Sequence, residues 1–201
     1  SKCAFCHESA RVDGNVADFD VLLSKLAGLP AGIELAIGVN QWTKPFEQFL
    51  YVAQTNGWII NATVNHGHLL RDYVVINNAI EQKLIHGIGI SYRKDYPIER
   101  LSLIKSDNAV LHVIAGIDDI EDVRQLSQTG IKKLSILGEK DFGFNVGNVK
   151  LDSPNHKNWY RKTVTLLDNF DLVSFDNLAL EQLNFKRFVK PEAWNIAYQG
   201  E

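Results

Sequence analysis

Short apolar runs rich in β-branched residues alternate along the chain with longer stretches of mixed polarity. The apolar runs predict six strands, at residues 33–38, 58–64, 85–91, 109–116, 131–138 and 170–175. Each run is apolar without alternation, which is typical of parallel strands that are buried on both faces. We therefore expect six short, parallel strands in the interior of the protein.

The stretches between these runs predict helices. They cover residues 15–29, 44–57, 69–84, 98–106, 119–130 and 155–169, and residues 174–189 predict closing helical turns. Pro45 stands near the start of the second helix, and Gly57 follows its end. Asp118 and Asp119 are natural N-caps for the fifth helix, which Gly130 closes.

The repeated strand–helix unit, about 25 residues long, predicts a single α/β domain over residues 1–201. Such alternation gives a parallel sheet with right-handed crossovers, either open or closed into a barrel. Ligands bind at the carboxyl ends of the strands in these folds. Polar residues and glycines gather there, at residues 38–41, 65–68, 91–94, 116–119 and 138–141. Loops and helix caps are also polar for structural reasons, so both interpretations stay open.

The composition is that of an ordinary globular protein, with 201 residues of which 45% are hydrophobic. A formal net charge of -3 provides no basic field for nucleic acid. No window approaches the roughly 18 apolar residues of a membrane span, and no signal-peptide pattern opens the chain. We expect a cytoplasmic protein without a membrane partner. Because the chain opens on Ser1 and contains no methionine, we also expect an excerpt truncated at both ends.

The two cysteines lie in the run Cys3-Ala4-Phe5-Cys6-His7. A c-type haem needs export and a second axial ligand, often methionine, and the sequence supplies neither. A thioredoxin-like dithiol follows a strand and opens a helix, whereas no strand precedes Cys3. Structural zinc needs four ligands. His66 and His68 directly follow a predicted strand, a position from which His66 can lie close to Cys3 and Cys6 and serve as a third ligand. Thiolates at this spacing also suit an iron–sulfur cluster, which takes three cysteines if one iron stays open.

The run "CAFC" resembles the last two cysteines and the aromatic residue of the Cys-x-x-x-Cys-x-aromatic-Cys loop of radical S-adenosylmethionine enzymes. This family has a partial (β/α)6 TIM-like barrel, and its first strand and first cysteine would fall before Ser1. The resemblance implies a [4Fe–4S] cluster on Cys3, Cys6 and an upstream cysteine. It also implies that S-adenosyl-L-methionine binds the open iron.

The later strands are similar to those of the family in order and spacing. Gly38-Val39-Asn40 stands where the family has a Gly-Gly-Glu-like motif, with Asn40 in place of the glutamate. "WIINATVNHG" resembles the third strand, "GIGISYR" the fourth, "LHVIAGIDDIED" the fifth and "KKLSILGEKDFG" the sixth. Ser91 would then contact the ribose, Arg93 the methionine carboxylate and Gly116 the adenine. The cofactor-binding residues implied are Phe5, Gly38, Asn40, Asn65, Ser91, Arg93 and Gly116. We expect all of them except Phe5 to line one cavity that faces the Cys3–Cys6 loop.

The function implied by this resemblance is reductive cleavage of S-adenosylmethionine to a 5′-deoxyadenosyl radical, which abstracts hydrogen from an unknown substrate. The reductant would be a protein such as flavodoxin or ferredoxin, and no catalytic residue is assigned. The alternative is a non-catalytic α/β binding domain with structural zinc at Cys3 and Cys6. Asn40 would then be a turn residue, and Ser91 and Arg93 would be ordinary loop residues.

Overall fold

The computed structural model describes residues 18–188. The predicted ligands Cys3, Phe5 and Cys6, and the start of the helix predicted at 15–29, therefore lie outside the described residues. The chain forms two compact units. Of the described residues, the first unit contains 18–111 and 128–131, and the second contains 112–127 and 132–188.

The two units alternate strands and helices, so the α/β class is confirmed. The first unit contains α1 (Phe19–Leu26), β1 (Glu34–Val39), α2 (Lys44–Thr55), β2 (Ile59–Asn65), α3 (His66–Glu81), β3 (Gly87–Ser91) and the 3-10 helix η1 (Ile98–Leu103). Strand β4 (Ala109–Ile114) and the 3-10 helix η2 (Leu126–Thr129) belong partly to each unit. The second unit contains α4 (Ile120–Gln125), β5 (Lys133–Leu137), η3 (Gly143–Asn145), α5 (Pro154–Lys162), η4 (Thr163–Asp168), β6 (Leu172–Phe175), α6 (Asn177–Gln182) and η5 (Phe185–Phe188).

The strands follow one another in the sheet in chain order, from β1 to β6. Strands β1, β2 and β3 pair in parallel, and so do β5 and β6. The register places Gly38 beside Thr63 and Thr63 beside Gly89. One pleat further on, Asn65 lies beside Ser91. The carboxyl ends of β1, β2 and β3 therefore share one edge of the first unit, which we call the β1–β3 edge.

Helix α3 begins three residues earlier than predicted, at His66 rather than residue 69. The side chain of Asn65, the last residue of β2, accepts a hydrogen bond from the His68 amide at 2.9 Å and so serves as the N-cap. A strand that ends on a capping residue passes directly into a helix. The segment 65–68, predicted as a loop, is therefore the cap and first turn of α3.

The other helix predictions are confirmed only in part. The stretch 98–106 forms only the 3-10 helix η1, and the stretch 119–130 is α-helical to Gln125 and continues as the 3-10 helix η2. Thr43 caps α2 and Pro45 occupies its first turn, whereas Gly57 lies just beyond its end with φ of 71°. Asp119 caps α4. The helix predicted at 155–169 changes to a 3-10 helix at Thr163, whose hydroxyl donates to the carbonyl of Trp159. Such back-bonding competes with the α-helical pattern and often bends helices.

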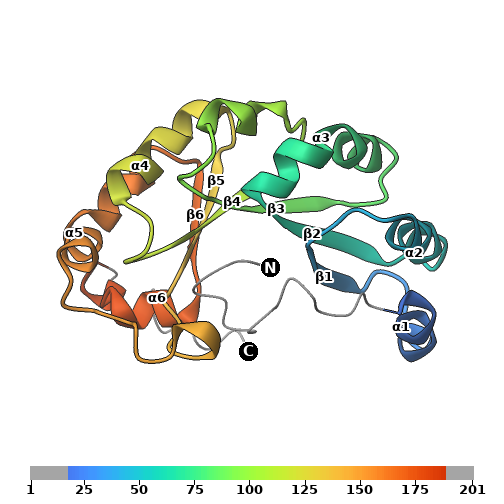
Figure 1. The fold of residues 1–201 in the computed structure, drawn as a ribbon, viewed down its shortest axis with the longest axis horizontal. Coiled ribbons are helices and arrows are strands. Elements are labelled where there is room, and N and C mark those ends of the chain that lie inside the picture. Colours follow the sequence, from blue (N-terminus) through green and yellow to red (C-terminus); the bar gives the residue numbers. More distant parts are fainter. Residues whose placement is uncertain (1–17, 189–201) are drawn as a thin grey trace. The chain divides into compact units, whose positions relative to one another are not determined.

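The core of the first unit lies on one face of β1–β3. Figure 1 shows α2 and α3 on the same side of these strands. Their apolar side chains cover the buried positions of β2 and β3, which are Ile60, Ala62, Val64, Ile88 and Ile90. The alternate positions are half-buried in β2 and β3 and mostly exposed in β1. The prediction of strands buried on both faces is therefore wrong for these strands, because α2 and α3 lie on one face and the side chains of the other face stay partly or fully exposed.

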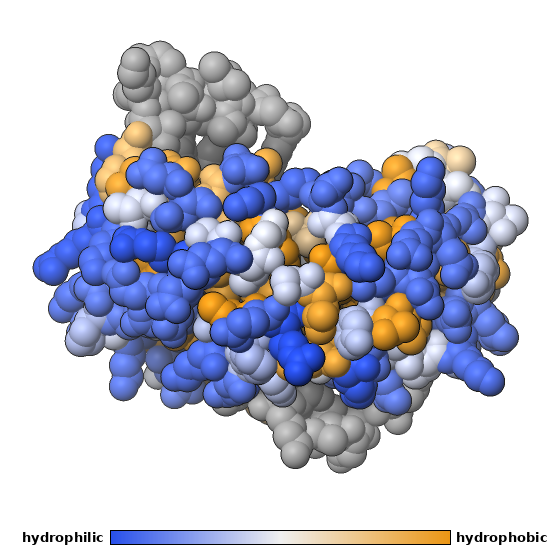
Figure 2. Space-filling model, turned by 90° about the horizontal axis from the view of Figure 1, so that it is seen from above, coloured by the Kyte–Doolittle hydropathy of each residue, from blue (hydrophilic) through white to orange (hydrophobic). Residues whose placement is uncertain are grey.

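Among the described residues, no helix is both long enough and apolar enough to cross a membrane. Figure 2 shows a face with mainly hydrophilic side chains, broken by small apolar areas. Scattered exposed apolar side chains of this kind are normal for a folded protein and indicate no binding surface by themselves.

Candidate functional site

The β1–β3 edge brings together four residues that the sequence assigned to a cofactor site. Gly38 lies in β1 and Asn40 follows its last residue, and both are exposed. Asn65 and Ser91 end the two neighbouring strands and are half-buried. The prediction that these strand ends lie on the same side of the sheet is confirmed within the first unit.

Arg93 lies two residues beyond β3, where its guanidinium forms an ion pair with Asp95 at 2.9 Å. The side chains of Arg93 and Asp95 are 36% and 59% exposed. Exposed ion pairs of this kind stabilise a fold by only about 0–1 kcal/mol. A ligand carboxylate that binds two of the guanidinium nitrogens can therefore replace Asp95 at small cost.

The Asn65 side chain is already engaged by the fold. Its Oδ1 atom accepts from the His68 amide, so this oxygen satisfies one of the unpaired N–H groups at the start of α3. The Nδ2 atom of Asn65 is the group that remains for a ligand. Asn65 can therefore contact a ligand as a donor while it caps the helix.

His66 is fully buried beside the rings of Tyr92 and Tyr96, whose centroids lie 6.2 and 5.5 Å from its own. Burial lowers the pKa of His66, against the smaller opposing effect of the Arg93 and Pro97 carbonyls. The His66 Nδ1 atom lies 3.3 Å from the Arg93 carbonyl oxygen, which only accepts hydrogen bonds, so Nδ1 carries the proton. His66 therefore anchors the segment that follows β3 onto the start of α3.

The first turn of α3 carries a second histidine with a lowered pKa, His68. Burial is the main cause at His68, and the positive charge of Arg71 adds to it. Arg71 forms an ion pair with Asp72 at 2.6 Å. Within residues 18–188, no three His, Cys, Asp or Glu side chains form a group that could hold a metal ion.

Gly116 belongs to the second unit, where it follows β4 with φ of 94°. Helix α5 holds the segment after it in place. The Asn155 amide donates to the Gly116 carbonyl at 2.7 Å, and the Trp159 indole donates to the Asp118 carbonyl at 2.7 Å. Trp159 is fully buried, so it acts in packing.

Two polar residues beside Gly116, Glu139 and His156, were not assigned to a site from the sequence. Glu139 follows β5, and its backbone exchanges hydrogen bonds of 2.8 and 2.9 Å with the Gln182 side chain. His156 lies on α5, and its Nε2 atom is 3.2 Å from the Gln182 carbonyl oxygen. In the sequence, the segment 138–141 is one of several polar strand ends, and no sequence pattern links it to His156.

A cavity of about 470 Å³ lies elsewhere in the first unit. Its lining residues are Ser102, Ile104, Lys105, Ser106, Asp107, Thr129, Gly130 and Ile131. They come from segments that precede β4 and β5, at the amino ends of these strands. None of the predicted site residues lines this cavity.

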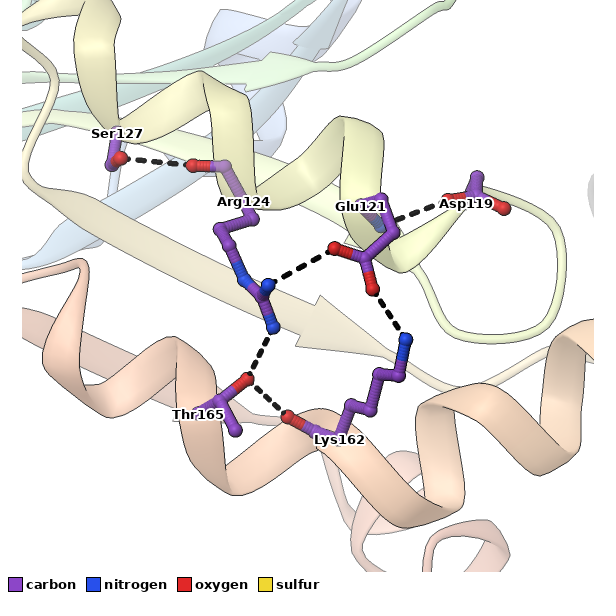
Figure 3. Close-up of polar contacts among 6 residues, drawn as sticks. All are labelled: Asp119, Glu121, Arg124, Ser127, Lys162 and Thr165. Atoms are coloured by element: carbon purple, nitrogen blue, oxygen red, sulfur yellow. Dashed lines mark hydrogen bonds and ion pairs between the residues drawn. The ribbon is translucent and has the colours of Figure 1, made fainter.

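Glu121 connects α4 to α5 in the second unit. Figure 3 shows its carboxylate between Lys162, at 2.6 Å, and Arg124, at 3.0 Å. Lys162, followed by Arg124, holds the pKa of Glu121 below its usual range. Arg124 also donates to Thr165 at 2.9 Å. These contacts agree with a structural role for Glu121, which lies in the first turn of α4.

Comparison with known proteins finds no matching family model, no matching curated protein and no matching solved structure.

Proposed function

We propose that the chain is the core of a radical S-adenosylmethionine enzyme, built as a partial (β/α)6 TIM-like barrel. The main support is the β1–β3 edge, where Gly38, Asn40, Asn65 and Ser91 gather at the carboxyl ends of neighbouring parallel strands. These strands follow the Cys-x-x-Cys run in the order and spacing of that family. Cys3 and Cys6 would hold two irons of a [4Fe–4S] cluster, with a third cysteine upstream.

The side chains at this edge suit the polar groups of S-adenosylmethionine. The exposed Arg93 guanidinium matches a carboxylate, and the Ser91 hydroxyl matches a ribose hydroxyl. The Asn40 amide oxygen accepts from an ammonium group, more weakly than the family's glutamate because it carries no charge. When bound, the cluster and S-adenosylmethionine supply hydrogen-atom abstraction, with an electron from a reductant such as flavodoxin or ferredoxin. Arg93 and Ser91 orient the bound molecule.

Metal content tests this proposal. We expect the full natural gene product, purified without oxygen and supplied with iron and sulfide, to bind both and to show broad thiolate-to-iron absorption in the visible region. Cys3→Ala and Cys6→Ala should each abolish this absorption, whereas His7→Ala, the matched control, should retain it. A colourless protein with one zinc ion per chain would refute the proposal and support the alternative, a non-catalytic binding domain with structural zinc.

A second experiment tests whether S-adenosylmethionine binds at the β1–β3 edge. We expect the reduced, cluster-loaded protein to form 5′-deoxyadenosine from S-adenosylmethionine. Arg93→Ala should weaken S-adenosylmethionine binding by about 1.5–3 kcal/mol, the usual contribution of a charged hydrogen bond, and Lys94→Ala should not. Equal affinity in the natural chain and Arg93→Ala would remove Arg93 from the site. A fully loaded protein that forms no 5′-deoxyadenosine would contradict the proposed activity.

A further inference from the structure

His156 places a buried hydrogen-bond acceptor in the second unit. The residue is only 3% exposed, and its Nδ1 atom has no hydrogen-bond partner among the described residues. Its Nε2 atom contacts a carbonyl oxygen, that of Gln182, so Nε2 carries the proton and Nδ1 presents a lone pair. An unsatisfied buried acceptor destabilises the fold, so a donor at this position would stabilise the protein.

A buried carboxylate oxygen faces the same place. Glu139 is 9% exposed, and its Oε1 atom accepts from the Asn145 amide at 3.2 Å. A Cβ atom on Gly116 would lie 3.4 Å from Glu139 Oε2 and 3.2 Å from His156 Nδ1. The two acceptors therefore converge beside a residue that has no side chain.

The charge at this place favours a cation. In residues 18–188, no basic side chain forms an ion pair with Glu139. The neighbouring Lys140 ammonium instead lies 5.8 Å from the ring centre of Phe142. A buried carboxylate without a positive partner is costly. A metal ion fits less well than an ammonium group, because no third His, Cys, Asp or Glu among the described residues completes a ligand set.

We propose that Gly116, Glu139 and His156 form a binding site for the cationic amino group of a small molecule. The ammonium group donates hydrogen bonds to Glu139 Oε2 and His156 Nδ1. Gln182 holds both residues in position, because its side chain bonds the Glu139 backbone and its carbonyl bonds the imidazole. This inference goes beyond the proposed function, and it needs neither a cluster nor S-adenosylmethionine.

Calorimetric titration of the full chain, without iron or S-adenosylmethionine, tests the site. The probes are propylammonium and putrescine, with 1-propanol as the uncharged analogue. We expect both amines to bind, and Glu139→Gln to weaken propylammonium binding at least tenfold. Glu181→Gln, which removes an exposed carboxylate from the same helix as Gln182, is the matched control and should bind like the natural chain. Equal affinity in Glu139→Gln and the natural chain, or propanol binding as tight as that of the amine, would overturn the proposal.

A second measurement avoids any loss of folding in the variant. The ¹⁵N-imidazole spectrum of the natural chain should show the His156 Nδ1 resonance shift as propylammonium is added, because an N–H donor then engages its lone pair. An unchanged His156 resonance at saturating amine would overturn the proposal. One equivalent of a divalent metal bound at Glu139 and His156 would overturn it too.

Discussion

Replacement of Asn65 separates the helix-capping role of this residue from any role in ligand binding. Asn65→Ala removes the oxygen that accepts from the His68 amide at 2.9 Å. Loss of an N-cap costs about 1 kcal/mol of folding free energy. Asn65→Asp keeps the acceptor and places a negative charge at the start of α3, which the helix dipole favours by about 0.3–1 kcal/mol. We therefore expect only the alanine variant to be destabilised.

Urea unfolding, followed by circular dichroism, measures this difference. For a slope of about 2 kcal/mol/M, Asn65→Ala should lower the midpoint by about 0.5 M, and Asn65→Asp should not lower it. Asn61→Ala is the matched control, because Asn61 lies on the same face of β2 but caps no helix, and its amide donates to Glu34 at 3.4 Å. Its midpoint should fall by less than half as much.

The same variants test the β1–β3 edge. Since the cap occupies Oδ1 of Asn65, only Nδ2 remains as a donor to a ligand, and the aspartate variant lacks it. Under the proposed function, Asn65→Asp should therefore weaken S-adenosylmethionine binding while the protein stays stable. An alanine variant as stable as the natural chain, or an aspartate variant destabilised to the same degree, would refute the capping argument.

Two further predictions concern packing and pH. Gly138→Ala would place a Cβ 2.5 Å from Leu178 Cγ and 2.7 Å from the Ala179 amide nitrogen, so we expect it to lower the free energy of unfolding by about 1–3 kcal/mol, measured in urea. The control is Gly28→Ala, whose added Cβ would have no atom within 4 Å and should leave the stability unchanged. Equal urea midpoints for the two variants would contradict the packing argument. Burial lowers the pKa of His66 below its ordinary 6.5, so the unfolded chain binds protons more readily, and the free energy of unfolding should fall as the pH drops below about 6.5. His66→Gln should show a smaller fall between pH 7 and pH 5, and parallel profiles would show that His66 does not contribute.

The order of elements follows from local features that a sequence displays directly. Pro45, Gly57 and Asp119 mark helix ends because each acts on its own backbone neighbours. The strand ends at the β1–β3 edge were equally predictable, because parallel strands bring their carboxyl ends together once their order is known. The start of α3 was missed because Asn65 ends a strand and caps a helix at once.

Which face of each strand is buried could not be predicted from the local sequence. Alanine and glycine count as apolar in a sequence, yet Ala36, Gly38, Gly87 and Gly89 lie on the strand face opposite to α2 and α3, where positions are exposed or half-buried. A pattern of apolar residues records what a strand can bury, whereas the placement of helices decides which face is buried.

The sequence by itself determined the α/β alternation, the parallel strand ends and the residues that resemble a cofactor site. Only the tertiary structure decided that Glu139, His156 and Gly116 meet. These residues come from three different segments, and Gln182, which holds the first two, lies 43 residues beyond Glu139. Contacts at such separations depend on how α5 and α6 pack against the ends of β4 and β5, and no local pattern encodes that packing.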